Sequence, residues 1–462
     1  MPEKTIIKNE PKNKKQAIPL ATWLLLLTIL LGAWMRAEVT IKTKVDTPIR
    51  ADARDYFSYA YNLNHHGIYS RDSRTIQGNS NITPPPDSLR SPGYPLFLTP
   101  FATRTPTDKT ILHITLAQAL LGILVILLTY ITSKQLIGNI WALLPTFLVA
   151  ISPQLINSGV YILSESLFTF LMAAAIACLT VQFKHAKTQW LTLLGGILLG
   201  AAAITRPTLN YIVPFLFMGL LPILAKGTRV KWSSTIMIGF IAPTLPWMLR
   251  NWFTLGGGDP TLAINSLVHG HYPWAMFEWN PMSIGYPYRF DPEIERLSSS
   301  IGSALSGIFE RVMSDPMLYI HWYFLGKPQM FFSWADVASA REFFTYPTPV
   351  SPYHNATPFV LSKAFMWATH SFLVVAAAIT AFVTIFRWKK STDRESYLSI
   401  RLLTVFFIYF VLLHIAGFPI ARYSTPLLPV VYMLATFGAV QVLNQLTALR
   451  SSALTASASR PS

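Results

Sequence analysis

The feature that most constrains this chain is a series of ten apolar segments. Each approaches the roughly 20 residues that an α-helix needs to cross the hydrocarbon core of a bilayer. Of the 462 residues, 52% are hydrophobic and 13% are charged, whereas a soluble domain carries about 25% charged residues. The sequence therefore predicts an all-α polytopic membrane protein and excludes an ordinary soluble enzyme. We place the spanning segments at 17–35, 110–132, 137–152, 161–182, 190–204, 208–225, 233–249, 359–386, 398–417 and 423–446.

The distribution of positive charge predicts an orientation in the membrane. Lysine and arginine are retained on the cytoplasmic side of short loops. If the N-terminus is inside, the inner loops and tails hold 18 Lys and Arg, and the short outer loops hold two, Arg206 and Arg422. We therefore expect both termini in the cytoplasm of a cell whose plasma or inner membrane the chain spans. The net charge of +16 then comes mostly from these loops, so nucleic acid is not an expected partner.

The first apolar segment is interpreted as a helix that remains in the protein. It follows five lysines and resembles a signal peptide in that respect. However, it is longer than a usual signal-peptide core, and no clear small-residue cleavage site follows it.

Two outer segments are too long to be simple connections, and loops of such length are usually functional. We expect short helices near 291–313 and 315–326 in the second of them. The predicted organisation is a cytoplasmic basic tail (1–16), the first helix (17–35), a first outer loop (36–109), helices two to seven (110–249), an outer loop or small cap domain (250–358), helices eight to ten (359–446) and a cytoplasmic tail (447–462).

The first outer loop is expected to carry a short helix at the membrane interface. Asp52 stands where an N-cap is expected, and Gly67 is a natural C-terminal stop. Between them, Tyr56, Phe57, Ala60 and Leu63 form one apolar stripe. Because an acid at a helix start is more often a cap than a catalyst, Asp52 and the nearby Asp55 remain ambiguous in isolation.

Four charged residues map to one outer level of the predicted bundle. Glu165 is the only acid inside a predicted span, and Arg206, Arg250 and Arg422 lie at helix ends against the positive-inside tendency. Arginine binds phosphate through two parallel hydrogen bonds and keeps its charge, so these residues favour an anionic ligand. The alternatives are that each arginine reaches lipid headgroups or a local acid and that Glu165 is a helix cap or structural ion pair.

Metal sites and disulfides receive little support from the sequence. The lone Cys178 excludes a disulfide within the chain and a cysteine-based metal site. Zinc at the histidine pairs is an alternative, but spacing identifies no third ligand. We therefore expect no cofactor, with a zinc or magnesium site as the alternative. The histidine pairs are His65 with His66 and His269 with His271.

A set of short motifs, in order, resembles the GT-C glycosyltransferases. Within them the chain is most similar to the branch of protein O-mannosyltransferases, lipid A aminoarabinose transferases and lipopolysaccharide-core galacturonosyltransferase-like enzymes. The resemblance covers about residues 17–255 and the last helix. The motifs are "DARDYFSYAYNLNHHGIY", "RSPGYPLFLTPF", "SPQLINSGVYILSESLFTFL", "AITRPTLNYIVPFLF", "PWMLRNW" and "ARYSTPLLPVVYML".

The resemblance implies a GT-C type bundle of about ten helices, with the catalytic acid on the interfacial helix of the first outer loop. It implies Asp52 as the general base, four residues before Tyr56, with Asp55 as the second candidate, and Glu165 as an orienting or second acid. Arg206 and Arg422 match positions near the lipid phosphate, and we add Arg250 to them. Tyr56, Arg90 and Tyr94 complete the expected substrate cavity.

The resemblance also implies an activity. Such enzymes transfer a sugar from an undecaprenyl- or dolichyl-type polyprenyl monophosphate to a hydroxyl of a lipid, glycan or protein acceptor at the outer face. Direct displacement would invert the anomeric centre, and a divalent metal is not required. The alternatives are an O-antigen ligase or polymerase and a secondary transporter, although a transporter usually shows internal repeats and short outer loops.

Overall fold

The computed structural model describes residues 19–76, 82–184, 189–273, 286–334, 343–386 and 394–458, with side chains to 452. Within these ranges the chain forms α-helices and short 3-10 or π-helical turns, and one isolated β-bridge joins Lys44 to Val350. The predicted tail 1–16 and most of the predicted inner loop 387–397 lie outside the described residues.

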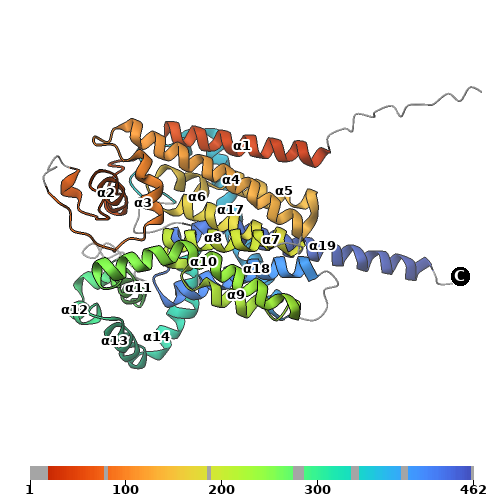
Figure 1. Cartoon of the computed structure of the whole chain (residues 1–462). Coiled ribbons are helices and arrows are strands. Elements are labelled where there is room, and N and C mark those ends of the chain that lie inside the picture. Colours follow the sequence, from red (N-terminus) through yellow and green to blue (C-terminus); the bar gives the residue numbers. More distant parts are fainter. Residues whose placement is uncertain are drawn as a thin grey trace, which may run out of the picture.

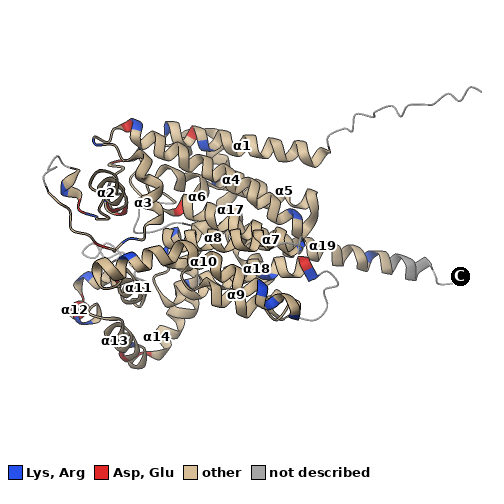
Figure 2. Ribbon diagram, in the orientation of Figure 1, with Lys and Arg blue, Asp and Glu red and all other residues tan. Residues whose placement is uncertain are grey.

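Six described helices are long and apolar enough to cross a membrane, which confirms the predicted polytopic all-α fold. They run alongside one another in Figure 1, with their ends at two opposite sides of the molecule. Charged side chains are sparse between these two ends in Figure 2. The helices are α1 (Leu20–Lys42), α4 (Asp108–Trp141), α7 (Glu165–Lys184), α17 (Thr357–Phe386), α18 (Arg394–Ala416) and the segment Ala421–Ser452, which joins η7 (Ala421–Leu427) to α19 (Leu428–Ala458).

The other four predicted spans differ from simple helices. The segment 137–152 contributes to a pair bent by 51°, because a proline follows α5 (Leu143–Ile151) at the start of α6 (Pro153–Asn157), which leads to η3 (Ser158–Val160). The segments 190–204 and 208–225 correspond to α8 (Trp190–Thr205) and to η4 (Pro207–Leu209) with α9 (Ile212–Leu220). The segment 233–249 lies inside the 30-residue α10 (Lys226–Leu255).

Glycines bring α8 and α10 into close contact. A Cβ atom added at Gly196 would lie 2.5 Å from the Ile236 carbonyl oxygen, and one at Gly239 would lie 2.5 Å from that of Leu193. Small residues let helix backbones approach in this way inside membranes. The contact fixes the position of α8, whose C-terminal end carries Arg206.

The first outer loop folds around α2 (Ala51–His66), η1 (Ser73–Thr75), α3 (Gly93–Leu98) and η2 (Thr99–Phe101). The predicted stop is confirmed, because Gly67 has a left-handed φ of 65° and its N–H bonds to backbone carbonyls of the last turn. The predicted N-cap is wrong. Arg50 occupies the cap position, and Asp52 lies in the first turn with its carboxylate directed to arginines.

We expect Gly93→Ala to separate α3 from α8 and to lower stability and any activity together. A Cβ atom at this position would lie 2.4 Å from Thr205 Oγ1 and 2.8 Å from the Thr205 backbone, so the neighbouring chain must move. A melting curve in detergent measures the effect, expected at about 1–3 kcal/mol. Gly302→Ala is the matched control, since its nearest neighbour is a side-chain oxygen 3.8 Å away. Equal melting temperatures for the two variants would contradict this contact.

The predicted second outer segment forms a small cap with its own core. Its helices include α11 (Thr261–Gly270), η5 (Pro287–Phe290), α12 (Ile294–Leu297), α13 (Ile301–Ser314), α14 (Pro316–His321), η6 (Trp322–Gly326), α15 (Lys327–Phe331) and α16 (Pro352–Asn355). Its core packs α11 against α12 and α13 through Ile264, Val268, Leu297 and Ala304. Figure 1 shows α11–α14 at the same end of the bundle as α2 and α3.

Candidate active site

Charged side chains from five separate parts of the sequence meet at the capped end of the bundle. Helix α2 contributes Asp52, the turn before α3 contributes Arg90, and the first residue of α7 is Glu165. Arg206 follows α8 at the break before Pro207, and Arg422 lies in η7. Both arginines lie at helix breaks, Arg206 just after α8 and Arg422 at the start of the last span, and both pair with Glu165 of α7.

The five side chains form one continuous chain of ion pairs. Arg90 Nη2 lies 2.7 Å from Asp52 Oδ1, and Arg422 Nη2 lies 2.9 Å from Asp52 Oδ2. Arg422 Nε then lies 3.2 Å from Glu165 Oε1, and Arg206 Nη1 lies 2.8 Å from the same oxygen. Arg422 thus stands between the two acids, one from the first outer loop and one from the bundle.

Several polar atoms in this chain lack a hydrogen-bond partner among the described residues. Glu165 Oε2 is buried without a partner, and the ion-pair contacts of Arg206 Nη1 and Arg422 Nε do not have hydrogen-bond geometry. The Glu165 side chain is only 4% exposed. Buried polar groups in proteins are nearly always hydrogen-bonded. Unpartnered buried atoms such as these are therefore typical of a site that binds a polar ligand.

The geometry separates the two candidate bases. Arg90 pairs with both, since its Nη2 atom is 2.9 Å from Asp55 Oδ2. Among the described residues, however, only Asp52 also pairs with Arg422. Asp52 therefore belongs to the chain that leads to Glu165, whereas Asp55 supports it from the side through Arg90.

The environment of Asp52 favours its ionised form. Burial by itself would raise the pKa of this carboxyl, but the charges and hydrogen bonds of Arg422 and Arg90 outweigh burial and lower the pKa to about 2. Burial by itself would lower the pKa of Arg90, but the charges of Tyr56, Asp52 and Asp55 outweigh burial and raise this pKa. Asp52 is thus a charged but weak base as long as both arginines hold it.

Two tyrosines pack next to Arg90, one in direct contact with its guanidinium and one behind the first. The Arg90 guanidinium lies 5.4 Å from the centre of the Tyr56 ring, and the Tyr94 ring meets Tyr56 edge-on at 5.1 Å. Tyr94 is fully buried and donates its hydroxyl hydrogen to Gln118 Oε1 at 2.8 Å. The structure therefore places Tyr56 and Arg90 beside the acids, whereas Tyr94 lies behind them as packing.

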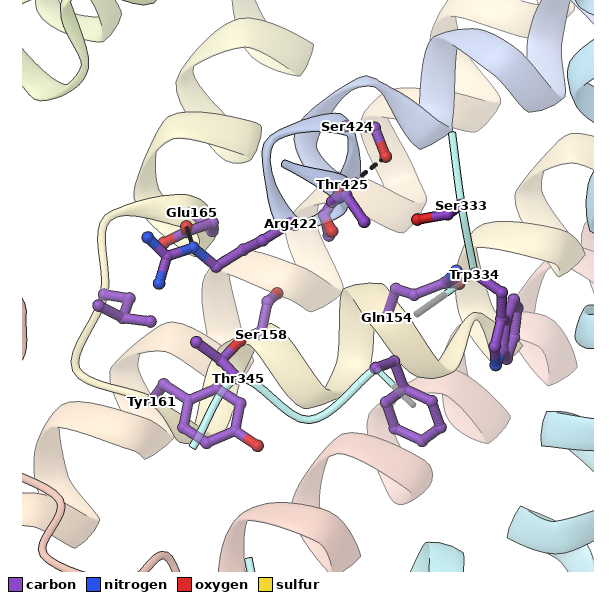
Figure 3. Close-up of a pocket in the computed structure, with 13 residues that line it drawn as sticks. Gln154, Ser158, Tyr161, Glu165, Ser333, Trp334, Thr345, Arg422, Ser424 and Thr425 are labelled. Carbon is purple, nitrogen blue, oxygen red and sulfur yellow. Dashed lines mark hydrogen bonds and ion pairs between the residues drawn. The ribbon is translucent and has the colours of Figure 1, made fainter. Parts of the chain in front are cut away.

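A cavity that is partly open to solvent lies beside the ion pairs. Figure 3 shows the Arg422 side chain reaching Glu165 at its wall, with Ser158 and Thr345 nearby. Most of the lining is uncharged and polar or aromatic. The lining residues are Gln154, Ser158, Tyr161, Leu163, Glu165, Ser333, Trp334, Phe343, Thr345, Ala421, Arg422, Ser424 and Thr425.

The sequence did not indicate the part of this wall that comes from the end of the cap. Ser333, Trp334, Phe343 and Thr345 come from irregular backbone after α15. Their one signal is the aromatic content of this segment. Arg90 was predicted as a cavity residue, but its pairing with both acids of α2 was not.

Arg250 takes a different position from the one expected. Its guanidinium donates to the carbonyl oxygens of Asp87 at 2.8 Å and Tyr69 at 3.2 Å. It also lies 5.2 Å from the centre of the Trp247 ring. Among the described residues no ion pair joins it to Asp52 or Glu165, so the structure gives it the role of fastening the first outer loop to α10.

The described histidines bond mainly to the surrounding protein. His65 Nε2 lies 2.9 Å from the Ala102 carbonyl oxygen, and the His269 ring stacks on Tyr288 at 3.6 Å. His271 Nε2 is 2.9 Å from Arg311 Nη1. In the described ranges, Asp, Glu, His and Cys do not gather in a group of three suited to a metal ion. That the protein works without a metal stays a prediction.

Comparison with solved structures identifies the fold. An oligosaccharyltransferase of Archaeoglobus fulgidus, solved with Zn and sulfate, superimposes over 94% of this chain and 51% of its own, at a TM-score of 0.50 and 15% identity. The chain has the GT-C glycosyltransferase fold. It spans about half the length of the oligosaccharyltransferase structures that it matches.

Two further structures resemble this GT-C chain at lower scores. AglB of the same archaeon, in complex with an inhibitory peptide and a dolichol-phosphate, matches 96% of this chain and 52% of its own, with 14% identity and a TM-score of 0.48. ArnT from Cupriavidus metallidurans, bound to undecaprenyl phosphate, matches 92% of this chain and 78% of its own, with 11% identity and a TM-score of 0.40.

Sequence comparison adds a partial family match. Residues 93–255 match the model of the dolichyl-phosphate-mannose-protein mannosyltransferase family. This stretch, about a third of the chain, includes Glu165 and Arg206 and leaves out Asp52, Arg90 and Arg422. A search of curated protein sequences finds no significant match.

Proposed function

We propose that this GT-C protein transfers a sugar from a polyprenyl monophosphate to a hydroxyl of a lipid, glycan or protein acceptor at the outer face of the membrane. The observation that carries the proposal is the chain of ion pairs from Arg90 to Arg206, of which Glu165 and Arg422 also line a polar cavity. The matched family, described by its use of dolichyl-phosphate-mannose, supports the same class of donor.

Arg422 and Arg206 are the proposed phosphate ligands. A guanidinium offers five N–H donors, and the acids engage only Nε and Nη2 of Arg422 and Nη1 of Arg206. The donors that remain, together with those whose contacts lack hydrogen-bond geometry, can bind phosphate oxygens. The two fixed cations also stabilise the negative charge that the leaving phosphate gains in the transition state.

Asp52 is the proposed general base. It takes the proton of the acceptor hydroxyl while that oxygen bonds to the anomeric carbon and the bond from this carbon to the phosphate oxygen breaks. This single displacement inverts the anomeric centre. A donor phosphate that draws Arg422 away from Asp52 would raise the pKa of Asp52 from about 2 towards its usual range, so the donor itself would strengthen the base.

The cavity is the proposed site of the sugar. Hydroxyl and amide side chains such as Ser158, Gln154 and Thr345 can hydrogen-bond to sugar hydroxyls, and Trp334 offers an aromatic wall. These groups line the same cavity as Glu165 and Arg422. Glu165, with one oxygen unpartnered, is the proposed residue that orients a sugar or acceptor hydroxyl.

We expect the capped end to face outwards and the loop 387–397 to be cytoplasmic. Figure 2 shows most described acids at the end with α2 and α11–α14, whereas Lys and Arg prevail near α9 and the start of α18, as the positive-inside tendency requires. In a Cys178→Ala background, Ser314→Cys should react with an impermeant maleimide on intact cells. Ser391→Cys should react only after permeabilisation, and the opposite pattern would invert the topology.

The proposed activity is tested by mass spectrometry of outer-face glycans and lipids in a deletion strain. The expected result is a glycan, lipid or protein that lacks one sugar, together with accumulation of the polyprenyl phosphate sugar. The wild-type gene should reverse both changes, whereas a gene encoding Arg422→Ala should not. A deletion strain with unchanged glycans and an unchanged pool of lipid-linked sugars would count against the proposal.

A further inference from the structure

The cap helix α13 carries a stripe of large apolar side chains that no described residue covers. Ile301, Leu305, Phe309 and Met313 recur every four residues, so they lie along one side of the helix. Phe309 is 65% exposed and Met313 61% exposed. The stripe continues through Met317 and Ile320 of α14 to Phe324 and Leu325 of η6, all of which are exposed.

This stripe is not the face that packs on the protein. Ala304 and Gly307 form the packed face, and a Cβ atom at Gly307 would lie 2.1 Å from Leu297 Cδ2. The α13 backbone is thus held directly against α12. A water-soluble cap of this size would need to cover the remaining apolar side with protein, because large exposed apolar patches mark interaction surfaces.

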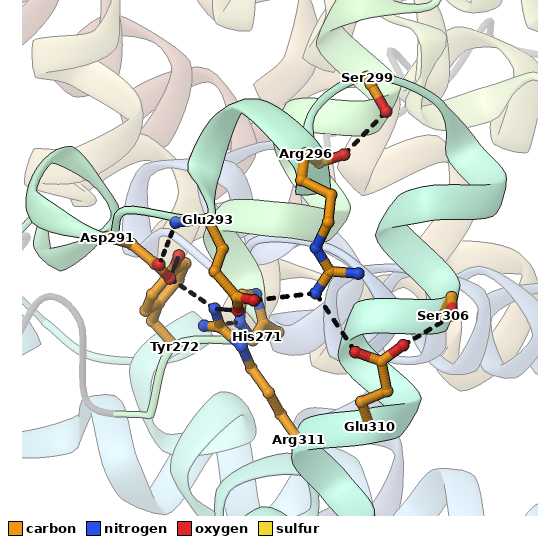
Figure 4. Close-up of polar contacts among 9 residues, drawn as sticks. All are labelled: His271, Tyr272, Asp291, Glu293, Arg296, Ser299, Ser306, Glu310 and Arg311. Carbon is orange, nitrogen blue, oxygen red and sulfur yellow. Dashed lines mark hydrogen bonds and ion pairs between the residues drawn. The ribbon is translucent and has the colours of Figure 1, made fainter.

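Ion pairs also hold α13 in place. Arg311 pairs with Asp291 at 2.7 Å and with Glu293 at 2.8 Å, and Arg296 bridges Glu293 and Glu310 at 3.2 Å each, as Figure 4 shows. The helix therefore has a packed side that includes Arg311, an exposed polar side with Ser306 and Glu310, and an apolar side. Such a division is typical of helices that lie in a membrane interface.

The far end of the stripe is fixed at the level where a spanning helix ends. The Lys327 ammonium, which directly follows η6, donates to the carbonyl oxygens of Ile415 at 2.7 Å and Gly417 at 3.0 Å, at the end of α18. In η6, Trp322 Nε1 donates to the Gly270 carbonyl oxygen at 3.0 Å. The exposed Phe324 and Leu325 are therefore tied to the outer end of a membrane span.

Apolar side chains are also exposed at the ends of helices that lead to or from the cap. Leu412 near the outer end of α18 is exposed, as are Trp252 and Phe253 at the end of α10, which leads into the cap. In Figure 1, α13 and α14 lie below α10 and α11, at the end of the bundle that also carries α2 and α3. This is the end at which Lys327 ties the segment to the end of α18.

We propose that the segment 301–326 is an interfacial membrane-binding element whose apolar stripe is seated among the acyl chains of outer-leaflet lipids. From this segment the chain continues through α15 to Ser333 and Trp334, which line the cavity. Lipid packing against the stripe therefore fixes one wall of the cavity. The proposal does not depend on the sugar donor or on catalysis.

The test is spin-label accessibility in phospholipid nanodiscs. In a Cys178→Ala background, labels are placed at Leu305 and Phe309 on the stripe, and at Ser303 and Ser314 on the polar side as matched controls on the same helix. Relaxation by oxygen, which concentrates in lipid, is compared with relaxation by a water-soluble nickel chelate. We expect a higher oxygen-to-nickel ratio at 305 and 309 than at 303 and 314.

Two results would overturn the proposal. Nickel access at 305 and 309 equal to that at 303 and 314 would mean that the stripe faces water. Shielding of 305 and 309 from both reagents would mean that protein covers it, either a second copy of the chain or another part of this one. A label at Met313 replaces any stripe variant whose melting temperature shows that it does not fold.

Discussion

Arg422→Ala is expected to lower donor turnover by about 10²-fold or more, the cost of removing one fixed donor from a developing charge. The reason is its position, since its guanidinium lies 2.9 Å from Asp52 and 3.2 Å from Glu165 at the cavity wall. Its loss removes a phosphate ligand and also the link between the two acids. Arg422→Lys should restore only part of the rate, because lysine lacks the planar fork.

The measurement is kcat/KM of the purified protein with a polyprenyl phosphate sugar, beside a melting curve. Arg250→Ala is the matched control, because that guanidinium donates to the carbonyl oxygens of Asp87 and Tyr69 rather than to the acids. We expect this control to lose stability while the folded fraction keeps near-normal KM for the donor. If Arg250→Ala weakened donor use and Arg422→Ala did not, the phosphate site would lie at α10.

Asp52→Asn should lower turnover by about 10²–10⁴-fold, the usual contribution of a positioned base. Asparagine is close in shape and can still accept a hydrogen bond from Arg90, but it cannot take a proton. Asp55→Asn should have a milder effect, because Asp55 pairs with Arg90 and, within the described part of the chain, not with Arg422. An active Asp52→Asn protein beside an inactive Asp55→Asn one would reverse the assignment.

The pH dependence of stability and of turnover gives a second test of the role of Asp52. Its pKa is lowered in the folded protein, so the ion pairs stabilise the fold above the usual value of 3.8, and this contribution is lost as the pH falls through about 2. The acid limb of kcat/KM, which reports the free enzyme, should follow the same low value. The acid limb of kcat should lie at higher pH, because the bound phosphate competes for Arg422.

Local rules accounted for much of the fold before the structure was known. Helix α2 and its stop at Gly67 follow from helix periodicity and from a residue that accepts positive φ. The positive-inside tendency singled out Arg206 and Arg422 as exceptions, and both lie in the ion-pair chain. Asp52 and Arg422 are 370 residues apart, so local reasoning did not predict that they pair.

The remaining features depend on contacts that spacing does not encode. Arg250 and Arg206 have the same signal, an arginine at the outer end of an apolar segment, yet Arg250 is bound by carbonyl oxygens of the first outer loop. Asp52 has the sequence position expected of an N-cap, but in the structure its carboxylate pairs with Arg90 and Arg422. The cavity wall at Trp334 comes from backbone without regular structure, where periodicity gives no guide.

The central claim is that the ion-pair chain binds a polyprenyl phosphate sugar and transfers its sugar by direct displacement. The most direct measurement is turnover by the purified protein of a panel of such donors with ¹³C at the anomeric carbon, followed by nuclear magnetic resonance of the product. The account predicts release of polyprenyl phosphate with inverted anomeric configuration in the product, and loss of both in Arg422→Ala and Asp52→Asn. A product with retained configuration, or undiminished turnover in both variants, would contradict it.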